Sequence, residues 1–447
     1  MQIKRRTLLH SLLFGSGYVG LRALATGLPV GILTRGPRAL ADTSTPTCAT
    51  PDKAQFFILS TSQYGDPINT NCPGVSYTDP SVVHPDPGIA GMPAGIAPGQ
   101  VTVGGQQYTA ASVWSQLGPD VGYFHMMTNT PVHPKEPQVL QLNGATAPTE
   151  MLPSLLAKTL APCLGTIQVQ PISLGASTPS EALTFGGQNL PTIPPQALKA
   201  TLTSAADPHN LRPLRDQTLQ QLSDLFRSSA TTAQQAYLDS LIASQTELRS
   251  INQSLLDTVA GITGNTVADQ ITAAIALVQM NVSPVIAIHI PFGGDNHTDI
   301  DLVAEATQTV SGVQSIASLM SQLQAAGLQD KVSFITLNVF GRTLGPGNLT
   351  PQNANGRQHN PDHQVSIAIG KPFKGGVWGG VMTTATDYGA TSMVSTTGAA
   401  APDGSGDIAP VDTLASFGKT VLAAVGADQG FIDSAITSGK VITGALT

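Results

Sequence analysis

Two short stretches of this sequence are almost continuously apolar and rich in β-branched residues, and they constrain the fold most strongly. They occupy positions 285–290 and 332–337. Strands that are apolar at nearly every position, rather than at alternate positions, are typical of sheets buried on both faces. Such sheets are mostly parallel and are covered by helices on both sides. The sequence therefore predicts an α/β fold built around a mostly parallel central sheet.

Shorter patterns predict the remaining regular structure. Runs rich in β-branched and aromatic residues predict strands at 55–62, 121–127, 166–174, 284–292, 332–340 and 364–369. Helical periodicity at 303–326, between two of these strands, predicts a strand–helix–strand crossover. A further helical stripe predicts a helical insertion at about 205–260. The Gly-, Pro- and Asn-rich segments 64–110 and 341–363 are expected to be loops.

The beginning of the chain has the layout of a twin-arginine export signal. A Lys-Arg-Arg run at 4–6 precedes an apolar stretch, and a small-x-small site at 39–41 follows it. Arg22 interrupts the apolar stretch before it reaches the roughly 20 residues that a membrane-spanning helix needs. A cleaved signal is therefore expected in preference to a permanent anchor.

The expected organisation is one exported domain. Residues 1–41 would form the signal peptide and 42–54 a polar linker, and 55–447 would form the α/β domain with its helical insertion. The protein is expected in the periplasm or outside the cell, without a stable membrane span once the signal is removed.

Charge and aromatic content argue against a nucleic-acid partner. The chain has 21 Lys and Arg against 28 Asp and Glu, and removal of 1–41 would leave only 15 basic groups. No cationic excess is available to neutralise phosphates, and aromatic residues, at 5%, offer few surfaces for base stacking. The hydrophobic fraction of 41% can supply a large core, which argues against disorder. An acidic globular protein is expected.

Three cysteines are an odd number for an oxidising compartment. Cys48 and Cys72 could close a short loop, which would leave Cys163 buried, although connectivity cannot be derived from the sequence. No Cys-x-x-Cys pair occurs, so a thiol redox site or a zinc ribbon is not expected.

Polar clusters follow four of the predicted strands. They contain Asp66, Asn69 and Thr70; His125 and His133; Asp295 and His297; and His359, Asp362 and His363. The carboxyl ends of strands in an open α/β sheet are the usual place for ligand sites. Carboxylate and imidazole together favour an ion of the zinc or manganese type, because calcium would need more carboxylates. Such an ion can polarise a phosphoryl or sulfuryl oxygen.

Structural roles compete with these assignments. A single histidine in a loop usually makes only hydrogen bonds, and Asp295 could simply cap the helix that follows it. His84, His209 and His289 lie in Pro-rich turns or among apolar residues and are expected to be structural. The sequence contains no Gly-x-Ser-x-Gly elbow and no His-Glu-x-x-His motif. The placement of several clusters after separate strands is what favours a site.

Four motifs in the second half of the chain occur in a recognisable order. They are Asp295-Asn296-His297, Asn338-Val339-Phe340-Gly341-Arg342-Thr343, Gly356-Arg357-Gln358-His359 and Lys374-Gly375-Gly376-Val377-Trp378-Gly379. In order and spacing they resemble Trp-Asp-Thr-His, Ser-Glu-Phe-Gly-Arg-Thr, Gly-Arg-Asp-His-Trp-Pro and Lys-Gly-Gly-x-Tyr-Gly of the exported family labelled domain of unknown function 1501. The resemblance extends over most of 55–430. It implies an alkaline-phosphatase-like α/β fold and, by superfamily analogy, a metal-dependent phosphate- or sulfate-ester hydrolase.

The resemblance also implies a cofactor, namely one divalent metal ion of zinc, manganese or calcium. The residues implied to bind it are Asp66, Asp295, His297 and His359. Two carboxylates of the family pattern are replaced, one by Val339 and one by Gln358. The remaining ligands suffice for at most one ion.

A substrate site beside the ion is implied in the same way. The residues implied to be catalytic are Asn69, Thr70 and Arg342, and those implied to bind a small anionic ester are Asn338, Arg357 and His363. An arginine offers a planar fork to anionic oxygens. The alternative is a non-catalytic periplasmic or surface protein that uses this fold to bind or assemble with a protein partner. The two lost carboxylates favour that alternative, and the retained Asp and His residues favour the hydrolase.

Overall fold

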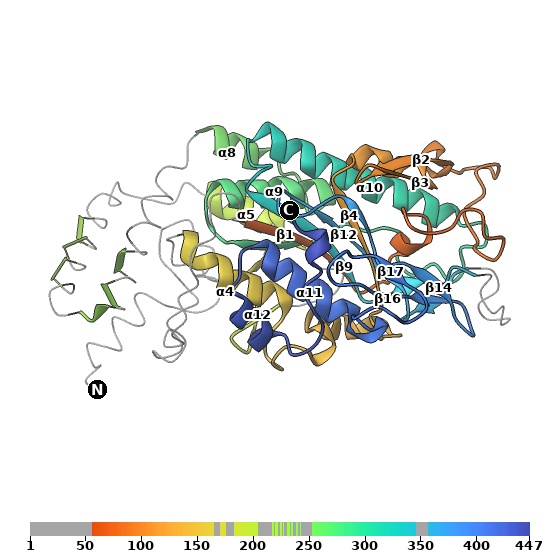
Figure 1. Ribbon diagram of the computed structural model, residues 1–447. Coiled ribbons are helices and arrows are strands. Elements are labelled where there is room, and N and C mark those ends of the chain that lie inside the picture. The colour runs from red at the N-terminus through yellow and green to blue at the C-terminus, as the bar shows by residue number, and fades with distance from the viewer. Residues whose placement is uncertain are drawn as a thin grey trace.

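Among the residues that the structure describes, seven strands form a central sheet in the computed structural model (Figure 1). The structure describes residues 56–164, 170–175, 183–203, scattered positions within 217–242, 253–345 and 356–447. In spatial order the strands are β13 (Gly376–Trp378), β4 (Val121–Met126), β12 (Gln364–Ile369), β9 (Val332–Asn338), β1 (Phe56–Ser62), β8 (Val285–Ile288) and β5 (Ile172–Ser173). Only β12 pairs antiparallel with its neighbours β4 and β9. The predicted α/β class with a mostly parallel sheet is confirmed.

All six predicted strands contribute to this sheet. β1, β4, β9 and β12 agree with their predicted ranges to within two residues at each end, whereas β8 is shorter than predicted and β5 is reduced to two residues. The predicted crossover is present, because α10 (Val303–Ala325) connects β8 to β9. β1 lies between those two strands and is parallel to both.

Helices cover both faces of the sheet (Figure 1). One face is covered by α5 (Pro195–Thr203), α8 (Gln253–Ala260), α9 (Val267–Gln279) and α10. The other is covered by α3 (Glu136–Leu140), α4 (Leu152–Leu164), α11 (Thr413–Ala424) and α12 (Gln429–Ala435). The side chains of β1 alternate between the two layers, with Ile58 packed in the first core and Leu59 in the second. This two-sided burial explains why the central strands have apolar side chains on both faces, in nearly continuous runs.

Residues 64–110 were expected to be a loop, but they contain a β-hairpin. β2 (Pro98–Val103) pairs antiparallel with β3 (Gln106–Ala111) through Gly104 and Gly105, which both have positive φ. Two consecutive positive φ values are typical of a two-residue hairpin turn and favour glycine at both positions. Four further two-stranded sheets join β6 (Thr184–Phe185) to β7 (Gln188–Asn189), β10 (Gly341–Arg342) to β11 (His359–Asn360), β14 (Val381–Thr383) to β15 (Tyr388–Ala390), and β16 (Ser392–Met393) to β17 (Ala400–Ala401).

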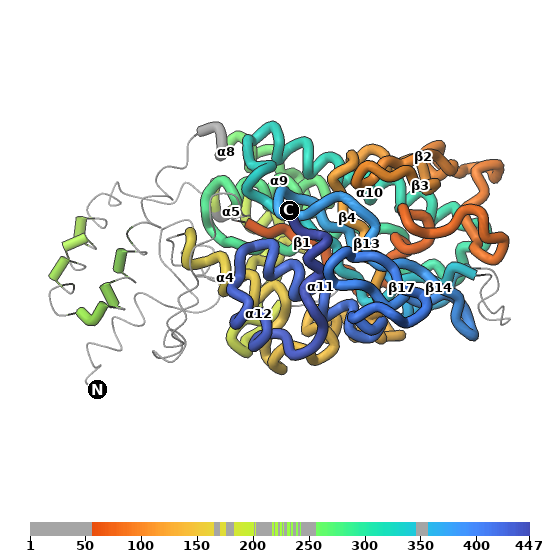
Figure 2. Tube along the Cα trace, in the orientation of Figure 1, coloured from red at the N-terminus to blue at the C-terminus, as the bar shows by residue number. Residues whose placement is uncertain are grey.

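The C-terminal segment returns to the body of the domain (Figure 2). Phe373 and Leu446 form an antiparallel bridge, and the Thr447 N–H donates to the Pro372 carbonyl oxygen at 3.1 Å. These contacts hold the chain end against the loop that precedes β13.

Several expectations lie partly or wholly outside the described residues. The predicted signal peptide, the linker, Cys48 and His209 are outside them, and so is most of the predicted insertion. Its described residues are α8, which is helical as predicted, and scattered positions within 217–242, most of which are also helical. Cys72 is buried, but Cys163 is only partly buried, contrary to expectation, because it lies at the end of α4. Within the described part of the chain, no helix has both the length and the apolar character needed to cross a membrane.

Candidate metal centre

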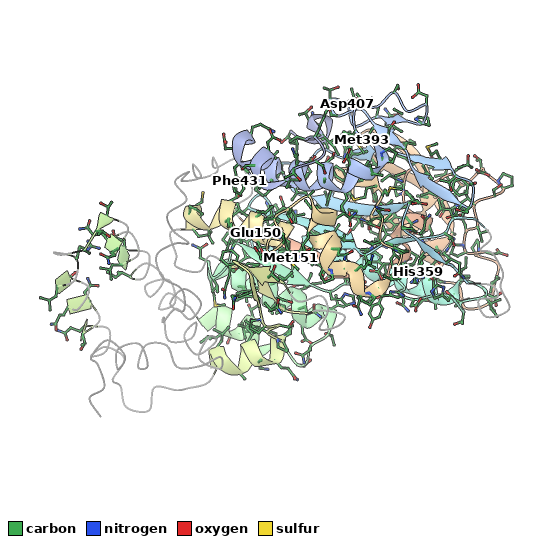
Figure 3. The ribbon with its side chains drawn as sticks, turned by 90° about the horizontal axis from the view of Figure 1, so that it is seen from below. Glu150, Met151, His359, Met393, Asp407 and Phe431 are labelled. Atoms are coloured by element: carbon green, nitrogen blue, oxygen red, sulfur yellow. The ribbon has the colours of Figure 1, made fainter. Side chains whose placement is uncertain are left out.

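The polar clusters predicted from the sequence meet at one edge of the sheet. Asn69 and Thr70 follow β1, His133 follows β4, Asp295 and His297 follow β8, and Arg342 and His359 follow β9. The four strands are mutually parallel, so the loops that leave their carboxyl ends lie at the same edge. In Figure 3 the labelled His359 lies at the opposite end of the domain from Phe431 of α12.

Four side chains at this edge form a compact group of metal-ligating atoms. His133, Asp295, His297 and His359 each offer one ligand atom, and these atoms all lie within 4.8 Å of one another. Asp295 Oδ1 is 2.9 Å from His297 Nε2 and 3.9 Å from His359 Nε2, and Asp295 Oδ2 is 3.5 Å from His133 Nε2. Ligand atoms about 2.0–2.2 Å from a tetrahedral ion are about 3.3–3.6 Å apart. The separations within the group, from 2.9 Å to at most 4.8 Å, lie on both sides of that spacing, so side-chain movements of up to about 1 Å would bring all four atoms to one ion.

The imidazoles of His133 and His359 are oriented by backbone carbonyl groups. The Nδ1 atom of His133 lies 2.7 Å from the Gln63 carbonyl oxygen, and the Nδ1 atom of His359 lies 2.7 Å from the Pro131 carbonyl oxygen. A carbonyl oxygen only accepts, so each Nδ1 carries the proton and donates it. In the neutral ring the lone pair is then on Nε2, which faces the group. This outer hydrogen bond is the usual companion of a histidine that binds a metal.

The His359 ring is further fixed by stacking. It packs against the Phe340 ring with a centroid separation of 4.2 Å and an interplanar angle of 27°. His297 Nε2 is 2.9 Å from His359 Nε2, so the two rings approach each other through their ligating atoms. Burial lowers the pKa of His359 to about 4, with the Arg342 charge acting in the same direction, and burial also lowers the pKa of His297. Both rings are therefore neutral near pH 7, as metal binding requires.

A buried arginine lies directly behind the carboxylate of the group. The Arg342 side chain is fully buried and donates to the carbonyl oxygens of Tyr64, Gly65 and Gly294. Its Nη2 also lies 3.3 Å from Asp295 Oδ1. The guanidinium therefore ties the loops after β1 and β8 together and orients the Asp295 carboxylate.

Glu305 holds the loop that carries Asp295 and His297 in place through hydrogen bonds. This fully buried carboxylate accepts hydrogen bonds from Asn296 Nδ2 at 2.7 Å, from Arg357 Nε at 2.5 Å and from Thr70 Oγ1 at 2.8 Å. Gly356 allows the closest approach, because a Cβ there would lie 2.2 Å from backbone atoms of the Asn296–His297 peptide. The loop is thus held between α10 and the segment before β11.

Asp295 does not cap the following helix, which was the structural alternative for it. The N-cap position of α10 is Leu302, and two of the first N–H groups of the helix, those of Ala304 and Glu305, donate to the Asp299 carboxylate at 3.1 and 2.8 Å. Asp295 is left facing the histidines, with 47% of its side chain exposed.

The structure brings together three of the four residues implied to bind metal, and Asp66 is not among them. Asp66 is buried, and its Oδ1 accepts from the Gly294 N–H at 3.3 Å. Burial raises its pKa, although the nearby His289 and local hydrogen bonds oppose that effect. The fourth member of the group is His133 instead. The sequence placed His133 in a cluster after a strand, but only the sheet order brings that strand close to β9 and β8.

The residues implied to contact substrate are buried and make internal contacts. Thr70 donates to the Pro67 carbonyl oxygen and to Glu305, and Asn69 is bonded to the Arg342 backbone. Arg357 is paired with Glu305. Asn338, the last residue of β9, and His363 are also buried. Their roles toward a substrate stay predictions.

The two positions at which the family's carboxylates are replaced differ in environment. Val339 is fully buried in the core, and Gln358 is partly exposed before β11.

Comparison with protein-family models and with curated proteins gives no match for this sequence.

Proposed function

We propose that this protein is an exported hydrolase of phosphate or sulfate esters that uses one divalent metal ion on an alkaline-phosphatase-like fold. The observation that carries the proposal is the group formed by His133, Asp295, His297 and His359 at the carboxyl edge of the sheet. Open α/β sheets bind their ligands at this edge. The resemblance to the exported family described above supports the reaction class.

The donor set favours a transition-metal ion. Three imidazole nitrogens and one carboxylate suit zinc or manganese, whereas calcium prefers six to eight oxygen ligands. The outer hydrogen bonds of His133 and His359 fix the tautomer that such an ion needs. The residues present therefore fit one ion of this kind.

The group is accessible from solvent, which a catalytic site requires. The side chains of His133, His297 and His359 are 24%, 24% and 21% exposed, and Asp295 is 47% exposed. A bound ion would supply Lewis acidity toward an ester oxygen and would lower the pKa of water. The protein would orient the ligands through Arg342, Phe340 and the backbone carbonyl groups described above.

Water is the nucleophile that this arrangement favours. The Thr70 hydroxyl, which the family resemblance implies to be catalytic, is buried, and its Oγ1 lies 2.8 Å from two acceptors, the Pro67 carbonyl oxygen and Glu305 Oε1. It is part of the Glu305 anchor and does not face the exposed group. Hydrolysis by direct attack of water needs no covalent enzyme intermediate.

The second candidate function is binding without catalysis, and one observation favours it. Asn69, Thr70 and Arg357, three of the residues implied to act on a substrate, make buried contacts within the domain. A domain that retained its metal group but no substrate contacts could bind an anionic or protein partner through the ion.

An activity screen on the purified protein distinguishes the two functions. Aryl phosphate and aryl sulfate esters would be tested with added zinc, manganese or calcium, and the metal content would be measured by elemental analysis. The hydrolase proposal expects turnover with zinc or manganese that His297→Ala abolishes. The matched control is His84→Ala, because His84 is also partly buried and bonded to a backbone carbonyl group but lies outside the group. Metal binding without turnover would support the binding function, and no metal binding would exclude the hydrolase and leave only a protein that uses this fold to bind or assemble with a partner.

A further inference from the structure

A chain of buried hydrogen bonds leads from the metal centre into the core. His125 and His363 are fully buried, and His125 Nδ1 lies 3.0 Å from His363 Nε2. His363 Nδ1 lies 3.2 Å from Asn69 Nδ2, and His125 Nε2 lies 3.1 Å from the Pro73 carbonyl oxygen. The chain therefore runs from Pro73 through the two histidines to Asn69.

The direction of every hydrogen bond in this chain is determined by its two ends. At one end, Asn69 Oδ1 accepts from the Arg342 N–H at 2.8 Å, and Asn69 Nδ2 donates to the Arg342 carbonyl oxygen at 2.7 Å. The second N–H of Asn69 faces His363 Nδ1 and the His363 carbonyl oxygen, at 3.3 Å from the latter. An amide nitrogen only donates, so His363 Nδ1 must accept.

The proton positions of both histidines follow from this. A neutral His363 that accepts at Nδ1 carries its proton on Nε2 and donates it to His125 Nδ1. His125 then carries its own proton on Nε2 and donates it to the Pro73 carbonyl oxygen. All ring nitrogens of the pair are satisfied with both rings neutral. Burial supports this state, because it lowers the pKa of His125 to about 4 and holds the pKa of His363 well below its usual range.

The chain ends at the peptide that organises the metal centre. Arg342 is opposite His359 in the pairing of β10 with β11, and its guanidinium contacts Asp295. Both hydrogen bonds from Asn69 hold the backbone of this one residue. A displacement of the Arg342 peptide would therefore move two members of the group at once.

We propose that Asn69, His363 and His125 are positioning residues of the metal centre, whose hydrogen bonds fix Arg342 and through it Asp295 and His359. This inference deepens the proposed function, on whose metal site it rests. It assigns Asn69 and His363 to the support of the site. The substitution of a residue of this kind typically lowers metal affinity by about 10- to 100-fold.

The decisive variant is Asn69→Asp. The new side chain has the same shape, but it replaces a hydrogen-bond donor with an acceptor and so reverses the direction of the hydrogen bonds that lead from Asn69 to the two histidines. The carboxylate cannot donate to the Arg342 carbonyl oxygen or to His363 Nδ1. His363 would then donate to the carboxylate from Nδ1. Either His363 becomes charged and still donates to His125 from Nε2, or it stays neutral and His125 must change tautomer or become charged. The matched control is Gln270→Glu, which makes the same amide-to-carboxylate change in α9. Gln270 is also buried, but its side chain bonds to the Asn265 carbonyl oxygen and the His289 N–H and not to Arg342 or Glu305.

The first measurement uses the metal-free full-length protein with ¹⁵N-labelled histidine and nuclear magnetic resonance. In the wild type, His125 and His363 should both be protonated at Nε2 only. In Asn69→Asp, the ring-nitrogen signals of His297 and His359 should shift, and in Gln270→Glu they should not. An Nδ1-protonated or charged His125 or His363 in the wild type would overturn the proposal, and so would unchanged His297 and His359 signals in Asn69→Asp.

The second measurement is the affinity for cobalt(II), followed by its visible absorption. Asn69→Asp should bind cobalt about 10- to 100-fold more weakly than the wild type, and Gln270→Glu should bind it as the wild type does. Equal affinities of Asn69→Asp and wild type would refute the positioning role. Should the wild type bind no cobalt, the proposed function fails. The nitrogen-15 signals would still show whether the hydrogen bonds from Asn69 to His125 position His297 and His359. Should Asn69→Asp not fold, Asn69→Ser replaces it, with the same expected direction.

Discussion

Two groups of polar side chains lie at the same edge of the sheet and differ in almost every property. The outer group, His133, Asp295, His297 and His359, is 21–47% exposed, and its ligating atoms face one another. The inner group contains Glu305, Arg357, Thr70, Asn69, His363 and His125, all at most 3% exposed. Its hydrogen bonds go to other buried groups of the protein.

The difference separates the residues that can bind a ligand from those that support them. A buried polar group must find its partners within the protein, because leaving one unsatisfied costs about 1–3 kcal/mol. The inner group meets that requirement and has no freedom left for a ligand. In the outer group the ligating atoms of the three histidines and of Asp295 face one another at a point with access to solvent. Proximity to the sheet edge alone therefore does not identify a functional residue.

The largest effect is expected from breaking the inner group at Glu305. In Glu305→Gln, Arg357 loses its buried counter-ion, and breaking a buried ion pair typically costs about 3–5 kcal/mol. Urea denaturation measures the loss in the free energy of unfolding. The exposed Asp330→Asn makes the same chemical change after α10 and should alter stability by less than about 0.5 kcal/mol. Equal stabilities of the two variants would contradict the structural role of Glu305.

Substitution in the outer group should weaken metal binding strongly and change the free energy of unfolding little, which is the opposite of what is expected for Glu305→Gln. His133→Ala and His297→Ala should each weaken zinc binding by at least about 100-fold, more than the loss of an outer hydrogen bond typically causes. Their free energies of unfolding without metal should change little, because these side chains are partly exposed. Titration calorimetry with zinc tests the predicted loss of affinity, and urea denaturation without zinc tests the predicted stability. Normal zinc affinity in His133→Ala would remove His133 from the site.

The third expectation concerns acid pH and the inner histidine pair. The unfolded His125 binds a proton below about pH 6.5, whereas the folded residue, with a pKa of about 4, does not. The unfolded state then binds more protons, so stability falls as the pH falls through this range. His125 should contribute a loss of about 2 kcal/mol between pH 7 and pH 5. His363, whose pKa burial also lowers, acts in the same direction.

The variant His125→Gln isolates this contribution from those of other histidines. It should make the dependence of unfolding free energy on pH shallower between pH 5 and pH 7, as measured by urea denaturation across that range. The same slope in variant and wild type would show that His125 is not held neutral by the fold.

The smallest effect is expected at Asp66, and it tests whether this residue belongs with the metal-binding outer group or with the buried residues behind it. Asp66 was implied to be a ligand, but its carboxylate faces the Gly294 backbone, and burial raises its pKa. Asp66→Asn should therefore change zinc affinity by less than about threefold, well below the loss expected for a ligand. Titration calorimetry against His133→Ala makes the comparison directly. A loss as large as that of His133→Ala would return Asp66 to the site.

Much of the fold was predictable because its signals are local. The apolar runs of β1, β8 and β9 arise because these strands are buried on two faces, and the helical periodicity of α10 arises because that helix is buried on one. The antiparallel direction of β12 and the hairpin of β2 and β3 were not predicted. Strand direction depends on which neighbour a strand pairs with, and the composition of the strand does not record that.

The site was predictable only as a set of candidates. The sequence by itself determined that Asp295, His297 and His359 follow strands of a parallel sheet, since chain order and strand patterns are sufficient to place them at its carboxyl edge. Only the tertiary structure decided that His133 completes their group, that Asp66 turns away, and that Asn69 and His363 face inward. The direction of a side chain at a strand end is set by the neighbours with which it can form hydrogen bonds, and those come from distant parts of the chain.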